Sequence, residues 1–160
     1  MAELKFKTRD VVITRIFDAP RELVWKAWTE PERIREWWGP KGWTSPTWKI
    51  DLRVGGKYLF CMRSSDGKDI WGTGTFKIID PPNELVYTDS FSDENGNVVP
   101  ASHYGFESEF PMEMQVTIRF EDQDGKTKLT LTHSGMPVSE GEGASTGWSE
   151  SFDKLAEILK

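Results

Sequence analysis

Apolar and polar residues alternate along successive segments between residues 48 and 133, as is typical of β-strands with one buried face. Short turn sequences such as Asp66-Gly67, Asn95-Gly96 and Asp124-Gly125 separate these segments. Strands joined in this way pair with their neighbours in the chain, so we expect an antiparallel meander. Strands are predicted at 48–53, 57–63, 70–79, 85–91, 112–120 and 127–133, with a polar loop at 100–111.

The last segment of the chain follows a helical period instead. Its apolar residues recur at the spacing of one helix face, with charged residues around them: Trp148, Phe152, Leu155 and Leu159. A sheet with one apolar face needs a cover on that face, and this helix can supply it. A twisted sheet that holds one helix rarely closes tightly at its ends, so we expect a cavity between them.

The N-terminal part adds a strand and two short helices. Val11–Phe17 is β-branched and apolar and is predicted as a strand. Residues 21–28 carry apolar residues at helical spacing, which predicts a first helix. The segment Thr29-Glu30-Pro31-Glu32 resembles a capping box that starts a second helix, and Gly39-Pro40 is expected to end it.

Composition fits one folded unit. The chain has 160 residues, of which 37% are hydrophobic and 29% charged, so residues 1–160 are predicted as a single α+β domain. No apolar run approaches the roughly 18 residues of a membrane span, and the first residues lack the apolar core of a signal peptide. A cytoplasmic location is expected. Cys61 is the single cysteine, which excludes an internal disulfide and a cysteine-based metal cluster.

Charge is unevenly distributed along the chain. Residues 1–63 carry 13 basic and 8 acidic side chains, a balance of +5, whereas residues 64–160 carry 7 and 18, a balance of −11. The basic residues are scattered and the whole chain has a net charge of −6, which argues against nucleic acid as a partner. The two readings left open are a solvated surface without a partner and a basic side that meets an acidic protein.

Six of the eight tryptophans lie between residues 25 and 48. Such large side chains either fill a core or line a site for an apolar molecule. Trp28 and Trp37 are expected to fix the two helices on the sheet. Trp38 and Trp43 flank Gly39-Pro40 in a poorly patterned loop and are candidates for the mouth of a pocket.

Further candidates for a ligand-binding wall come from the apolar faces of the strands and the last helix. Methionines adapt to irregular space, and Gly72 and Gly74 remove side-chain volume from one face of their strand. Tyr87 and Asp89 share a face and are candidates for polar contacts. The predicted ligand-binding residues are Trp38, Trp43, Tyr58, Phe60, Met62, Trp71, Phe76, Tyr87, Met112, Met114, Leu131, His133, Trp148, Phe152 and Leu155.

His133 is the leading polar candidate, because it follows Leu129 and Leu131 on the face that the last helix covers. It is the one candidate acid or base, and the competing interpretation is a structural hydrogen bond to backbone or to Trp148. Its distance from His103 in the sequence gives no metal-ligand pattern. No phosphate loop, dinucleotide loop or nucleophile motif is present, so no metal and no cofactor are expected.

Several segments together resemble the START-type helix-grip (SRPBCC) superfamily. They are VVITRIFDAPRELVWKAWTEPERIREWWGP, IDLRVGGKY, DPPNELVYT, KTKLTLTHSGMP and GWSESFDKLAEIL. The branch they resemble is the one named after the C-terminal domain of the activator of the heat-shock protein 90 ATPase. The resemblance implies a helix-grip fold, in which a long C-terminal helix lies across a curved antiparallel sheet, and it suggests a link to the stress response.

Three functions are compatible with that resemblance, because members of the superfamily bind lipids, hormones or polyketides and some are cyclases or hydrolases. The residues favour a protein that binds a small apolar or aromatic molecule, over an enzyme. The alternatives are a co-chaperone-like module that stimulates a heat-shock protein ATPase, and a cyclase or hydrolase that uses His133 in the same cavity. Residues 139–147 contain Gly141, Gly143 and Gly147 and are predicted to be a mobile gate.

Overall fold

The computed structural model describes residues 7–106 and 110–159, and in this part of the chain seven strands form one antiparallel sheet in the order β1-β7-β6-β5-β4-β3-β2. The six strands β2 to β7 are therefore a meander, as predicted, and β1 joins its far edge beside β7. The elements are β1 (Thr8–Phe17), α1 (Arg21–Thr29), α2 (Pro31–Ile34), β2 (Thr44–Ile50), β3 (Lys57–Arg63), β4 (Asp69–Asp80), β5 (Glu84–Ser92), η1 (Ala101–Tyr104), β6 (Met114–Gln123), β7 (Lys126–Pro137), η2 (Val138–Glu140) and α3 (Gly141–Ile158).

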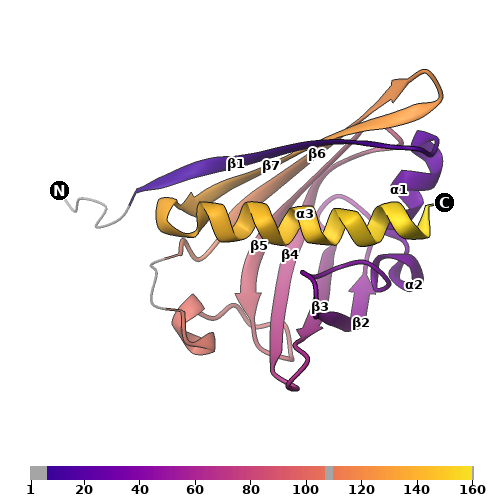
Figure 1. The fold of residues 1–160 in the computed structure, drawn as a ribbon. Helices are drawn as coiled ribbons and strands as arrows, with labels where there is room; N and C mark the ends of the chain where they lie inside the picture. The colour runs from indigo at the N-terminus through magenta and orange to yellow at the C-terminus, as the bar shows by residue number, and fades with distance from the viewer. Residues whose placement is uncertain (1–6, 107–109, 160) are drawn as a thin grey trace.

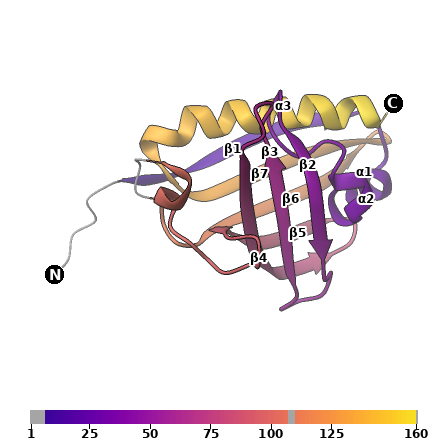
Figure 2. The same ribbon diagram turned by 90° about the horizontal axis from the view of Figure 1, so that it is seen from below.

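The long helix α3 lies across one face of the curved sheet, and α1 and α2 lie at one end of that sheet (Figures 1 and 2). Phe152 and Leu155 of α3 are fully buried, as the predicted apolar stripe requires. This arrangement confirms the expected α+β helix-grip architecture. None of the helices in the described residues is long and apolar enough to cross a membrane.

Tryptophans join the two short helices to the rest of the core. The Trp37 indole is fully buried and donates a hydrogen bond of 3.0 Å to the carbonyl of Ala27 in α1. The rings of Trp28 and Trp37 meet edge to face with 4.7 Å between centroids, and Trp28 also contacts Phe152 of α3. Trp28 and Trp37 therefore fix the helical pair against the sheet and α3.

The start of the second helix differs from the prediction. Thr29 is the last residue of α1, and its hydroxyl donates to the carbonyl of Trp25 instead of capping a new helix. The four-residue helix α2 has Glu30 at its N-cap position with no side-chain capping bond. The predicted capping box is wrong because a threonine in the last turn of a helix can donate its hydroxyl to a carbonyl of the preceding turn.

Strand and helix boundaries also shift. The strand expected at 48–53 is β2 (Thr44–Ile50), an edge strand whose irregular pairing accommodates Pro46. The strand expected from Met112 begins at Met114, and the side chain of Met112 is 51% exposed, so its predicted inward position is wrong. The predicted loop at 100–111 contains η1, and residues 107–109 lie outside the described part. Helix α3 begins already at Gly141.

Candidate functional site

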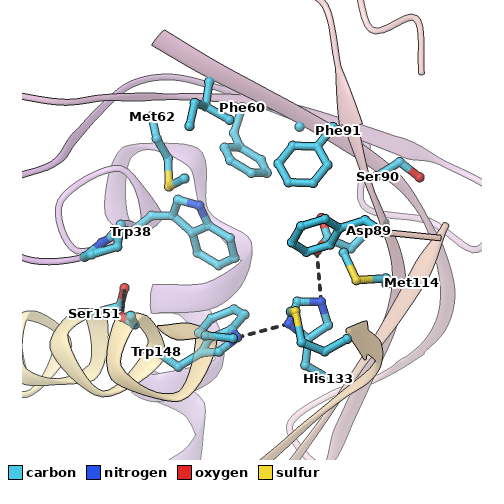
Figure 3. Close-up of a pocket in the computed structure, with 18 of the residues that line it drawn as sticks. Trp38, Phe60, Met62, Asp89, Ser90, Phe91, Met114, His133, Trp148 and Ser151 are labelled. Atoms are coloured by element: carbon cyan, nitrogen blue, oxygen red, sulfur yellow. Dashed lines mark hydrogen bonds and ion pairs between the residues drawn. The ribbon is translucent and has the colours of Figure 1, made fainter. Parts of the chain in front are cut away.

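A cavity of about 240 Å³ lies between the first half of α3 and the sheet. Five strands, α3 and the loop after α2 all contribute to its wall, which is largely aromatic and methionine-rich (Figure 3). The lining residues are Trp38, Gly39, Pro40, Phe60, Met62, Ile70, Trp71, Gly72, Asp89, Ser90, Phe91, Phe110, Met114, His133, Met136, Gly143, Ala144, Gly147, Trp148 and Ser151.

The pairing of β3 with β4 forms the apolar side of the cavity. Phe60 lies on β3 directly opposite Gly72 of β4, and a Cβ atom at Gly72 would lie 2.5 Å from the Phe60 ring. Glycine at this position therefore allows the Phe60 ring to lie flat over β4. Trp38 closes the same side, since its ring contacts Phe60 at 5.3 Å and Trp148 of α3 at 5.1 Å between centroids.

Three polar side chains from three elements meet in the cavity wall. The Trp148 indole N–H donates a hydrogen bond of 3.2 Å to Nδ1 of His133. On the other side of the ring, Nε2 of His133 lies 3.1 Å from Oδ2 of Asp89 (Figure 3). The His133–Asp89 pair is at ion-pair distance without hydrogen-bond geometry, and Nε2 has no hydrogen-bond partner among the described residues.

The hydrogen bond from Trp148 determines which nitrogen of the His133 imidazole carries the proton. Because Nδ1 accepts a hydrogen bond, it carries a lone pair, so the ring is neutral and its proton is on Nε2. A general base needs an open lone pair directed at the substrate, and in His133 that lone pair is already occupied. His133 is thus arranged to donate a hydrogen bond from Nε2, and the arrangement disfavours its use as a base.

Asp89 lies at the boundary between the cavity and the deeper core. Burial raises the pKa of Tyr58 well above its usual value, and the negative charge of Asp89 raises it further. Burial and the charge of Asp89 raise the pKa of Tyr87 in the same way. The Tyr58 hydroxyl donates to the carbonyl of Thr88 at 2.8 Å, whereas the buried Tyr87 hydroxyl has no hydrogen-bond partner among the described residues.

The structure brings about half of the predicted ligand-binding residues together. They come from the loop after α2, four strands and α3, and all of them line the cavity: Trp38, Phe60, Met62, Trp71, Met114, His133 and Trp148. The alternation along β3, β6 and β7 predicts Phe60, Met62, Met114 and His133 of this set, and the helical stripe of α3 predicts Trp148.

The other predicted residues lie elsewhere. Trp43 is partly buried outside the cavity, and its carbonyl accepts a hydrogen bond from Lys154 of α3. Met112 is exposed, as described above. A separate void of about 10 Å³ is lined in part by Tyr58, Phe76 and Tyr87. The remaining predicted residues are fully buried core: Leu131, Phe152 and Leu155.

Several lining residues were not among the predicted ligand-binding residues. Asp89 was considered for polar contacts, but its position beside His133 depends on the register of β5, β6 and β7, because Asp89 faces Met114 and His133 faces Val116. Met136 was missed because β7 continues past His133 to Pro137. Ala144 was missed because α3 begins at Gly141, about two turns before its apolar stripe starts at Trp148.

Metal binding has no support in the geometry. Within residues 7–106 and 110–159, no three histidine, cysteine, aspartate or glutamate side chains lie close enough to hold a metal ion. The polar groups of the cavity are instead a carboxylate, an imidazole N–H and two serine hydroxyls, from Ser90 and Ser151. This set can bind a polar group of an organic molecule through hydrogen bonds.

Comparison with solved structures gives the same fold in bacterial proteins. A protein from Mycobacterium smegmatis superimposes with a TM-score of 0.79 at 23% identity, over 99% of this chain and 96% of that chain. A protein from Arthrobacter aurescens gives a TM-score of 0.79 at 26% identity, over 94% and 85%. CalU16 from Micromonospora echinospora gives 0.68 at 23% identity, over 96% and 77%.

Sequence comparison adds the family. No match is found among curated protein sequences. Residues 18–160, nearly the whole chain, match the family described as Activator of Hsp90 ATPase homolog 1-like protein. The protein therefore belongs to the Activator of Hsp90 ATPase homolog 1-like (AHSA1) family.

Proposed function

We propose that this protein binds a small, largely apolar molecule of one or two rings between α3 and the sheet. The observation that carries the proposal is the cavity of about 240 Å³ with an aromatic wall and one polar corner at Asp89 and His133. An apolar cavity of about 150 Å³ in another protein binds benzene, so this space suits a naphthalene-sized compound. Apolar burial would supply the affinity, and the polar corner would orient the molecule.

The entrance is proposed to involve the first turns of α3. Gly143 and Gly147 line the cavity within the predicted gate at 139–147. Each glycine lowers local helix stability by up to about 1 kcal/mol, so these turns are expected to open more readily than the rest of α3. Opening here would admit a ligand without moving the sheet.

Two measurements test the binding proposal. Native mass spectrometry of freshly purified protein should detect a retained small molecule, and isothermal titration calorimetry with 2-naphthylmethanol should give saturable binding at one site. Ala144→Leu places a larger side chain in the cavity wall and should weaken that binding at least about tenfold. Thr146→Leu, on an exposed position of the same helix, is the matched control and should bind normally. If Ala144→Leu binds 2-naphthylmethanol as tightly as the unmodified protein, the probe binds outside this cavity.

A second candidate is a co-chaperone-like module, favoured by the family description alone. In this role the basic N-terminal half would contact an acidic region of a heat-shock protein ATPase. The expected result is binding that weakens with salt, together with a faster ATPase rate. A pull-down at low and high salt with a parallel ATPase assay would remove this candidate if neither effect appears.

A hydrolase or cyclase role has less support. The lone pair of His133 Nδ1 is occupied by the Trp148 N–H, so catalysis would first require that hydrogen bond to break. A binding role leaves the hydrogen bond between Trp148 and His133 intact.

A further inference from the structure

The charge in the cavity wall is negative. Asp89 is the single charged side chain among the described residues that line the cavity, and neither lysine nor arginine is among them. His133 adds no positive charge, because its Nδ1 accepts the Trp148 hydrogen bond and the ring is neutral. The wall therefore carries one negative charge in otherwise uncharged surroundings.

The Asp89 carboxylate is poorly satisfied. Its side chain is only 22% exposed, and its contact with His133 lacks hydrogen-bond geometry. The groups behind it compensate only in part, since the Tyr58 hydroxyl interacts with Asp89 but also donates to the Thr88 carbonyl, and the Tyr87 hydroxyl has no partner among the described residues. A partly buried carboxylate with few donors is unfavourable, and a ligand that brings a positive donor would offset this.

We infer that the cavity selects molecules that join a flat apolar body to a protonated amine. The inference rests on the ligand-binding function proposed above and names its ligand class. The ammonium group donates to Asp89, and the apolar body lies among Trp38, Phe60 and Phe91 (Figure 3). Electron-rich ring faces around the same space attract a cation as well. A carboxylate ligand of the same shape would be repelled by Asp89.

Three probes of nearly equal shape test this selectivity: 2-naphthylmethylamine, 2-naphthylmethanol and 2-naphthoate. In calorimetry at pH 7 the amine should bind at least about tenfold more tightly than the alcohol, and the carboxylate should bind most weakly. Asp89→Asn keeps the shape of the side chain and removes its charge. This variant should lose the preference for the amine, so that its affinities for the amine and the alcohol lie within about twofold of each other.

Glu121→Gln is the matched control, because it removes one negative charge from an exposed position on β6. It should keep the full preference for the amine. Equal affinities for the three probes in the unmodified protein would overturn the inference and leave the proposed binding function intact. Binding of none of them would overturn both. The comparison of probes on the unmodified protein does not depend on whether Asp89→Asn folds.

Discussion

Two neighbouring buried tyrosines should respond in opposite directions to loss of their hydroxyls. Tyr58 and Tyr87 are both about 95% buried, and their rings meet edge to face at 5.3 Å. The Tyr58 hydroxyl donates to the Thr88 carbonyl at 2.8 Å. The Tyr87 hydroxyl has no hydrogen-bond partner among the described residues. We therefore expect Tyr58→Phe to destabilise the protein and Tyr87→Phe to stabilise it.

The magnitudes follow from these contacts. A made hydrogen bond contributes about 1 kcal/mol net, so Tyr58→Phe should lower the free energy of unfolding by about that amount. An unpartnered buried hydroxyl costs about 1–3 kcal/mol, so Tyr87→Phe should raise it by at least about 1 kcal/mol. For a chain of this length 1 kcal/mol corresponds to about 2–4 °C in Tm, so the two variants should differ by about 4–8 °C.

Thermal unfolding by circular dichroism and urea titration at pH 7.5 measure both changes. The void beside Tyr87 is about 10 Å³, at the lower limit for a water molecule. Two groups in its wall lack a hydrogen-bond partner within the described part of the chain, the Tyr87 hydroxyl and the Trp28 indole N–H. We expect it to be dry. If Tyr87→Phe destabilises the protein as much as Tyr58→Phe, a water satisfies that hydroxyl and the reasoning fails.

Alkaline pH gives a second readout of the same pair. Burial raises the folded-state pKa of Tyr58 and Tyr87 well above the usual 10.0. Their contribution to stability is fully present below pH 10, where both states are protonated. Above pH 10 the unfolded chain releases protons that the folded protein keeps, so stability falls as pH rises towards the folded-state pKa. Each phenylalanine variant should show a shallower fall.

Three further predictions follow from single positions. Gly72→Ala should destabilise the protein by about 1–3 kcal/mol and weaken probe binding, because its Cβ would lie 2.5 Å from the Phe60 ring; an unchanged Tm would contradict this. Burial, and to a lesser extent the charge of Asp69, raises the pKa of the Cys61 thiol to about 11, so thiol reagents should label it slowly at pH 8 and rapidly in urea. Gly143→Ala adds a methyl group in open space and should stabilise α3 by about 0.5–1 kcal/mol, slow hydrogen exchange at 141–147 and slow probe entry. Exchange at 141–147 already as slow as in the core strands would remove the proposed gate.

Local periodicity was enough to predict most of the fold. The strand at Lys57–Arg63 matches its predicted bounds, and the buried positions of Phe152 and Leu155 follow from helical spacing. Such patterns show which face of a segment is apolar. A sheet covered on one face by a helix buries the apolar faces of all these segments together. Boundaries were less accurate, as at Met112, where an apolar residue precedes the strand but lies in solvent.

The polar corner of the site was harder to predict. His133 and Asp89 lie 44 positions apart and meet only because of the pairing register of β5, β6 and β7. A shift of one residue would turn either side chain to the opposite face of the sheet. The sequence does not state this register, so each residue could be named as a polar candidate while their contact could not.

The position of β1 beside β7 affects the order in which the molecule can be built during synthesis. Each strand from β3 to β7 can pair with the strand made just before it, but Phe17 must wait for Thr127. At ribosomal rates of about 5–20 residues per second, those 110 residues take roughly 6–20 s. Throughout that interval the apolar strand that ends at Phe17 has no partner in the sheet. Its charged residues Arg9, Asp10 and Arg15 are of the kind that keep an unpaired strand from associating with other chains, so we expect them to limit association of the nascent chain.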